Sequence, residues 1–141
     1  NSTRAVIAGD NDTKISYVTI ASTGNASEFG NRTEANNLIG ACASSTTALF
    51  AGGEQSSTNT IDQITIASTG NAVDFGNLTS TSNAGAYGTS GLGRGIFAGI
   101  GSSRINIEYV TIASSGNASD FGDLSVNRKA GAATSAAHGG L

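Results

Sequence analysis

Residues 61–76 read IDQITIASTGNAVDFG, and close copies occupy residues 15–30 (ISYVTIASTGNASEFG) and residues 107–122 (IEYVTIASSGNASDFG). Equivalent positions in neighbouring copies lie 46 residues apart, as Gly24 and Gly70 do (70 − 24 = 46). A period of this size is typical of a chain built from repeated supersecondary units. The repeat therefore determines the architecture more firmly than it determines a function.

The chain divides into three repeat units of one repeat domain, at about residues 1–46, 47–93 and 94–141. Units this small must pack against one another to form a core. The 20 glycines and the low charged fraction of 12% resemble the composition of a flexible linker. Linkers do not carry regularly spaced Val, Ile, Phe and Tyr, so we predict a folded, all-β chain.

Each unit contains four short stretches that predict strands. The first is apolar and ends in glycine, the second is rich in β-branched residues, the third passes through a repeated phenylalanine, and the fourth is mostly small. In chain order the stretches are residues 4–9, 15–22, around Phe29 and 37–44; residues 48–53, 61–68, around Phe75 and 83–90; and residues 95–99, 107–114, around Phe121 and 128–135. The small residues of the fourth stretch would allow close packing at a crowded axis.

The link between the second and third stretches carries Gly-Asn in every unit. Both residues tolerate positive φ, so the dipeptide predicts a hairpin turn at Gly24-Asn25 and at its copies. The loop between the first and second stretches varies in length, which predicts one exposed edge of the repeat array.

Three features recur in the units: glycines after the first strand, as at Gly52-Gly53, a tyrosine in the second strand (Tyr17 and Tyr109), and the later phenylalanine. With them the chain resembles kelch-type repeats, which form the four-stranded blades of β-propellers. Gln63 departs from the tyrosine pattern, and phenylalanine stands where kelch repeats carry tryptophan. The repeat is also similar to kelch-like arrays in predicted surface or tailed-phage structural proteins of aquatic microbes, which implies a surface or virion role.

Three units make an incomplete propeller, because propellers generally need at least four blades. We therefore expect completion by another chain or by further repeats. A dimeric six-bladed ring, a longer array and an open fibre are the alternatives. If a ring closes between chains, residues 128–135 should lie beside a first strand such as residues 5–9 of the partner chain.

Residues that usually carry catalysis are scarce. The chain has one histidine, His138, and one cysteine, Cys42, which lies among small residues. Neither a nucleophile with an adjacent base nor a zinc site is predicted, so we expect no enzyme activity and no cofactor. A hydrolase whose catalytic residues lie outside this sequence is a third alternative.

The net charge of −3 and the pI near 4.8 argue against a nucleic-acid partner. The longest apolar runs are far shorter than the roughly 20 residues needed to cross a bilayer, so no membrane insertion is expected. The sequence lacks an initiator methionine and a signal peptide, which indicates a processed chain or part of a longer one.

Two groups of residues are candidate ligand sites. Asp10 and Asp12 lie close together in a predicted loop and could offer carboxylate oxygens to Ca²⁺. Tyr87 lies outside the repeated tyrosine position and is near Asn83 and Arg94 in sequence. An exposed aromatic ring beside amide and charged groups is typical of a sugar-binding site.

The Asn-x-Ser/Thr pattern of N-glycosylation occurs six times. It falls at Asn1, Asn11, Asn25, Asn31, Asn77 and Asn117. Turn geometry is the alternative reason for asparagine at these positions. Taken together, the sequence predicts a non-enzymatic structural and interaction module of an extracellular, fibre or virion-surface assembly. A carbohydrate-binding adhesin or lectin-like propeller that binds surface glycans is the alternative.

Overall fold

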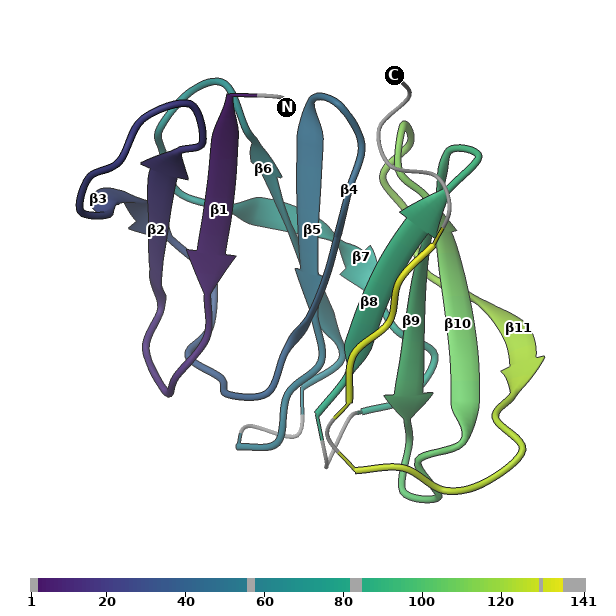
Figure 1. Cartoon of the computed structure of the whole chain (residues 1–141). Coiled ribbons are helices and arrows are strands. Elements are labelled where there is room, and N and C mark those ends of the chain that lie inside the picture. Colours follow the sequence, from purple (N-terminus) through teal and green to yellow (C-terminus); the bar gives the residue numbers. More distant parts are fainter. Residues whose placement is uncertain (1–2, 56–57, 82–84, 130, 136–141) are drawn as a thin grey trace.

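The computed structural model of the chain describes residues 3–55, 58–81, 85–129 and 131–135, and these are all-β (Figure 1). The described residues form eleven strands and contain no helix. The strands are β1 (Arg4–Ala8), β2 (Lys14–Thr19), β3 (Ser27–Asn31), β4 (Gly40–Ala43), β5 (Thr47–Ala51), β6 (Thr60–Thr65), β7 (Val73–Asn77), β8 (Tyr87–Gly91), β9 (Arg94–Ile100), β10 (Asn106–Thr111) and β11 (Ser119–Asp123). The expected twelfth strand is absent, because no strand occurs in the described part of residues 128–135.

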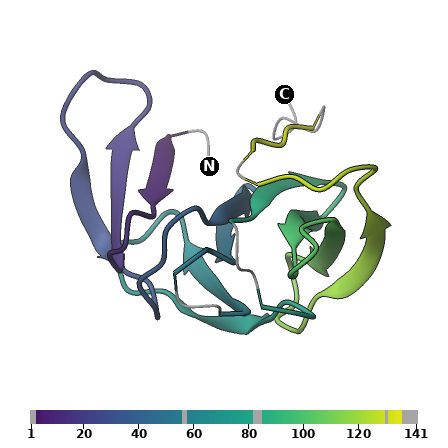
Figure 2. The same cartoon turned by 90° about the horizontal axis from the view of Figure 1, so that it is seen from below.

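The strands form three antiparallel sheets in which neighbours in sequence are neighbours in space. The first sheet has the order β1-β2-β3, the second β4-β5-β6-β7 and the third β8-β9-β10-β11. Figure 2 shows the sheets following one another in chain order. No closed ring is formed by the described residues.

The sheets do not coincide with the repeat units, because the fourth strand of one unit pairs with the first strand of the next. β4 pairs with β5, and β8 pairs with β9. The connections explain this grouping. Leu92 and Gly93, the only residues between β8 and β9, both have positive φ (53° and 78°), as a tight hairpin turn requires. Strands joined this closely pair with each other.

The Gly-Asn links do not form the tight hairpin turns that we predicted. β2 ends at Thr19 and β3 begins at Ser27, so the link is a longer loop. The corresponding links of the second and third sheets reach the preceding sheet and hydrogen-bond to it, as described below. Contact with a neighbouring sheet therefore accounts for these residues better than local turn geometry does.

The core consists of two apolar clusters, each lying between neighbouring sheets. One contains Ile15 and Phe29 from the first sheet together with Phe50 and Ile64 from the second sheet. Ile66, which directly follows β6, belongs to the same cluster. The other contains the corresponding residues of the second and third sheets. These include Leu49, Ile61, Phe75, Phe97, Val110 and Ile112. Side chains alternate along a strand, so the second sheet contributes one face to each cluster.

The fourth strands β4 and β8 pack closely against each other, as their small residues predict. A Cβ atom placed on Gly88 would lie 2.1 Å from the carbonyl oxygen of Ala41, and one on Gly40 would lie 3.1 Å from the Cβ of Ala86. Residues 131–135 run beside β8 in turn (Figure 1), where Ser135 Oγ donates a hydrogen bond to the carbonyl oxygen of Ser90. Three successive segments of small residues thus line the inner side of the array.

Candidate functional site: the two end faces of the array

A short set of backbone hydrogen bonds joins the first sheet to the second. The backbone N–H of Gly70 donates to the carbonyl oxygen of Phe29 (2.8 Å), and that of Ala72 donates to Asn31 (2.8 Å). The backbone N–H of Asn31 donates to Oδ1 of Asn71 (3.0 Å). The outer strand of one sheet is thus held by the Gly-Asn loop of the next.

The same three bonds join the second sheet to the third. They run from Gly116 N to Phe75 O (2.9 Å), from Ala118 N to Asn77 O (2.8 Å) and from Asn77 N to Asn117 Oδ1 (3.0 Å). The same three hydrogen bonds occur at two interfaces 46 residues apart, so the sheets pack on one another in the same way each time. The sequence repeat therefore preserves the residues that make the contacts between sheets.

Buried carboxylates strengthen both interfaces. Asp62 accepts a hydrogen bond from the Thr33 hydroxyl (2.6 Å) and pairs with the Arg32 guanidinium (3.0 Å), with both side chains of the pair fully buried. Glu108 accepts from the hydroxyl (2.6 Å) and the backbone N–H (2.7 Å) of Thr79. A buried carboxylate is tolerated where it is paired with a cation or accepts hydrogen bonds. Through these contacts each carboxylate connects its sheet to the segment that follows the preceding sheet.

The first sheet presents an outer face that has no neighbour within the described residues. We call it the leading face and define it by Ala5, Ile7, Val18 and Ile20. Ile7 is 55% exposed and Ile20 is 59% exposed. Their equivalents in the second sheet, Phe50 and Ile66, are buried at the first interface.

The third sheet presents the opposite face. We call it the trailing face and define it by Tyr109, Phe121 and Gly122. Phe121 is 55% exposed, whereas the equivalent Phe75 is 3% exposed. A Cβ atom on Gly122 would meet nothing within 4 Å, whereas one on Gly76 would lie 2.3 Å from the carbonyl oxygen of Gly116.

The two end faces therefore carry the same repeat positions as the two sides of each internal interface. We did not identify them from the sequence. In the repeat, Ile7 is equivalent to Phe50 and Phe121 is equivalent to Phe75, so the sequence does show that these positions are apolar in more than one unit. It does not show which side of each strand faces a neighbouring sheet, and that information is needed to identify the end faces.

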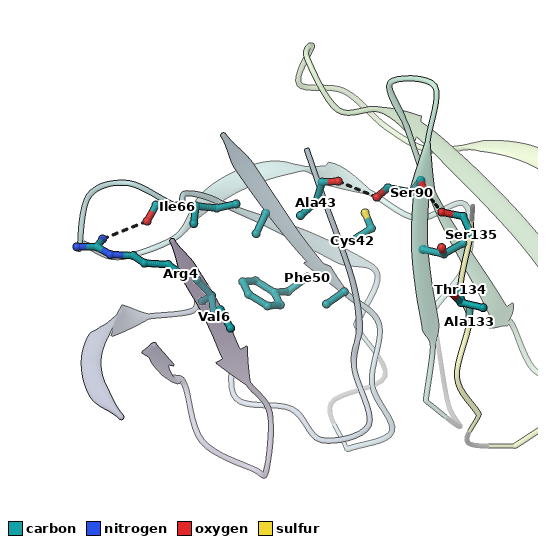
Figure 3. Close-up of a pocket in the computed structure, with 14 residues that line it drawn as sticks. Arg4, Val6, Cys42, Ala43, Phe50, Ile66, Ser90, Ala133, Thr134 and Ser135 are labelled. Carbon is teal, nitrogen blue, oxygen red and sulfur yellow. Dashed lines mark hydrogen bonds between the residues drawn. The ribbon is translucent and has the colours of Figure 1, made fainter. Parts of the chain in front are cut away.

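A groove of about 500 Å³ runs along the inner side of the array (Figure 3). Its lining includes Arg4 and Val6 of β1, Cys42 of β4, Ser90 of β8 and Ser135. β1 is the edge strand of the first sheet, and no described strand pairs with its inner side. In the other two sheets β4 and β8 fill this position.

Arg4 is held in place at one end of the groove. Its guanidinium lies 4.5 Å from the centre of the Tyr17 ring and donates to the carbonyl oxygens of Ile66 (3.1 Å) and Ala67 (3.0 Å). Its side chain is therefore engaged with both the first and second sheets.

The structure separates the residues of the predicted sugar site. Tyr87 is buried, and Cβ atoms on Gly99 and Gly131 would lie 3.0 and 3.2 Å from its ring, so the ring is not the exposed plate that we expected. Arg94 lies at the other end of the β8–β9 hairpin and stacks on Tyr109 at 4.6 Å. Asn83 lies outside the described residues. Glycan binding stays a prediction, which exposure of the unmodified chain to a glycan array would test.

Asp10 and Asp12 lie in the loop between β1 and β2. Asp12 Oδ1 accepts a hydrogen bond from the backbone N–H of Lys14 (3.2 Å), and both Asp10 and Asn11 have positive φ (70° and 54°). Among the described residues no group of three or more His, Cys, Asp or Glu side chains could hold a metal ion. The calcium site stays a prediction.

The predicted glycosylation positions differ in their surroundings. Asn11, Asn25, Asn77 and Asn117 are exposed, and Asn1 lies outside the described residues. Asn31 is half-buried, and its Nδ2 donates to Asn71 Oδ1 (3.4 Å). The threonines of the Asn31 and Asn77 patterns are Thr33 and Thr79, whose hydroxyls bind the buried carboxylates. The threonines at these two positions are therefore explained by their hydrogen bonds to buried carboxylates, without glycosylation.

The two reactive residue types are not brought together. Cys42 is buried, and this burial raises the pKa of its thiol to about 12, so the thiol stays protonated at neutral pH. His138 lies outside the described residues. The described part of the chain contains no helix long and apolar enough to cross a membrane.

Comparisons with known proteins add no identity to this geometry. No protein-family model matches the chain, and a search of curated proteins found no match. The resemblance to kelch repeats therefore stays a prediction.

Proposed function

We propose that the chain is a non-enzymatic structural and interaction module whose sheets act as propeller-type blades. Its leading and trailing faces bind further units of the same kind and so build an extracellular, fibre or virion-surface assembly. The surface location rests on the resemblance of the repeat to kelch-like arrays in structural proteins.

One observation carries the proposal: apolar positions that are buried at both internal interfaces are exposed at the two ends. Burying Ile7, Ile20 and Phe121 would remove apolar area from water, at about 25 cal/mol for each Å². Exposed apolar surface that matches an internal interface of the same chain supports association between units.

The scarcity of reactive groups supports a role without catalysis. The buried Cys42 thiol is a poor nucleophile because its pKa is raised to about 12. The chain has a single histidine to act as a base, and its described carboxylates at the interfaces are already hydrogen-bonded to threonines.

Gly122→Ala tests the proposal. The added methyl group meets nothing within 4 Å among the described residues, but the equivalent methyl at Gly76 would collide with the next Gly-Asn loop. Sedimentation velocity over a range of protein concentrations should show assembly of the unmodified chain and at least about tenfold weaker assembly of Gly122→Ala.

Gly93→Ala is the matched control. Gly93 also has positive φ (78°) and open space around its Cβ position, but it lies in the β8–β9 turn, away from the end faces. Gly93→Ala should also lose stability to backbone strain, less than Gly122→Ala because the φ of Gly93 is 78° and that of Gly122 is 137°, and it should keep the assembly. A chain that stays monomeric at every concentration would contradict the proposal.

A further inference from the structure

We propose that residues 132–135 of one copy pair with the inner edge of β1 in a second copy, as an added antiparallel strand with Ser135 opposite Ala5. This inference rests on the proposed function, because it names the partner and the register of the contact between array ends. The occupant of the groove beside β1 is thus a second copy of this chain.

The two complete sheets show how the inner position is filled. β4 pairs with β5 and β8 pairs with β9, in each case as a strand of small residues on the inner edge. The first sheet begins at β1 and lacks this strand within the described residues. An edge strand with unpaired N–H and C=O groups is a template for a strand from another chain.

A chain of serine hydrogen bonds identifies the missing strand. Ser90 Oγ donates to the carbonyl oxygen of Ala43 (2.7 Å), and Ser135 Oγ donates to the carbonyl oxygen of Ser90. Ala43, Ser90 and Ser135 therefore hold equivalent places in three successive inner segments. The first two segments each pair with a following strand, whereas residues 131–135 have no such strand in the described chain.

Strand register fixes the alignment of the proposed pair. Ala43 lies opposite Ala48, and Ser90 lies opposite Gly95. Ala48 and Gly95 correspond to Ala5, because the three residues pair with Ile64, Val110 and Val18 respectively, which are 46 residues apart (64 − 18 and 110 − 64). Ser135 therefore belongs opposite Ala5. Continuing antiparallel, Thr134 falls opposite Val6, Ala133 opposite Ile7 and Ala132 opposite Ala8.

The size of the groove suits this strand. The added segment carries only alanine, threonine and serine side chains, and the groove beside β1 has a volume of about 500 Å³. The inner strands already tolerate a very close approach, as Gly88 and Ala41 show.

Pairing between copies is favoured over pairing within one chain. Figure 3 places Arg4 and Val6 on one side of the groove and Ala133–Ser135 on the other, beyond Cys42 and Ala43 of β4. Residues 131–135 also hydrogen-bond to β8 through Ser135, which holds them on the side of the third sheet. Reciprocal pairing of two copies would close a ring, and successive pairing would extend a fibre.

Single cysteines in separate chains test the register. An Ala5→Cys chain is mixed with a Ser135→Cys chain under mild oxidation, and cross-linked dimers are separated by non-reducing electrophoresis. Directly opposite residues of antiparallel strands lie about 4.5–5.5 Å apart between Cα atoms, within reach of a disulfide. Because the cysteines are on different chains, only pairing between copies gives this product. The native Cys42 is retained in both chains, and the unmodified chain gives the background level of cross-linking through it.

Ala5→Cys mixed with Ala133→Cys is the matched control, because the Ala5→Cys chain is the same in both mixtures. Ala133 and Ser135 are both exposed, and two residues apart they share one face of the proposed strand. In the proposed register Ala133 lies two residues out of alignment with Ala5, about 7–8 Å away, which is beyond disulfide reach. We expect the Ser135 mixture to cross-link at least about tenfold faster than the Ala133 mixture.

The outcomes separate this inference from the proposed function. Equal cross-linking of the two mixtures, or assembly without cross-linking, overturns the strand pairing but leaves assembly through the end faces standing. A doubly substituted Ala5→Cys/Ser135→Cys chain that forms only an internal disulfide also overturns it, because the chain would then close on itself. Absence of any assembly overturns both proposals.

Discussion

Phe75 and Phe121 occupy the same position of the repeat, and the structure predicts very different costs for replacing them with alanine. Phe75 is 3% exposed, whereas Phe121 is 55% exposed. Replacing a buried phenylalanine costs about 3–5 kcal/mol, part of which comes from the cavity left behind. Phe121→Ala removes about half the buried area and leaves no closed cavity, so about 1–2 kcal/mol is expected.

The assay is equilibrium unfolding in urea, followed by circular dichroism, for the unmodified chain, Phe75→Ala and Phe121→Ala. Phe29→Ala serves as a second interior case, since Phe29 is also buried. Each variant is measured at two protein concentrations. The cost of Phe75→Ala should not depend on concentration, because its interface lies within one chain. The cost of Phe121→Ala should rise with concentration as a second copy covers the ring.

Equal costs for Phe75→Ala and Phe121→Ala in the dilute sample would refute the reasoning. That result would mean that contacts within each sheet, and not the neighbouring sheet, provide the stability. The T-shaped contact between Phe121 and Tyr109, with ring centres 6.1 Å apart, is the within-sheet contribution that would then dominate.

Three further substitutions and conditions probe the interior. Glu108→Ala should destabilise the fold by about 1–3 kcal/mol, because it leaves the backbone N–H and the hydroxyl of Thr79 without their acceptor at the second interface, whereas Glu108→Gln should cost less in the same urea assay. Cys42 should resist thiol reagents at pH 8 until the chain is unfolded. Folding raises the pKa of the Cys42 thiol from 9.0 to about 12, so the stability of the fold should decrease as the pH increases from 9 towards 12, and melting temperatures measured over this range would show it. Gly88→Ala should cost at least about 1–3 kcal/mol, since its methyl would lie 2.1 Å from the Ala41 carbonyl oxygen, and an unchanged melting temperature would contradict the close packing of β4 and β8.

Strand positions could be predicted well from the sequence, because the signals are local. Short apolar runs that end in glycine became β1, β5 and β9, and the β-branched stretches became β2, β6 and β10. The Gly-Asn loops were predicted less well. Asn71 and Asn117 accept hydrogen bonds from another sheet, and that partner is 40 residues away in sequence.

The candidate site was predicted only in part. The sequence predicted completion of the array by another chain or by further repeats, which stays a prediction, and it selected Tyr87 as an exposed aromatic residue. The structure instead buries Tyr87 near Gly99 and Gly131 and exposes Phe121. Neither result follows from local sequence, because Phe121 and Phe75 have almost the same neighbours in the chain.

The sequence by itself determined the all-β composition, the 46-residue period and the approximate positions of the eleven strands, since these depend on residues close together in the chain. Only the tertiary structure decided which strands share a sheet and which repeat positions are covered. The physical reason is that a repeat residue is buried by a neighbouring sheet, either the next or the preceding one, and not by its own. The same sequence motif is therefore core in the middle of the array and an exposed contact surface at its ends.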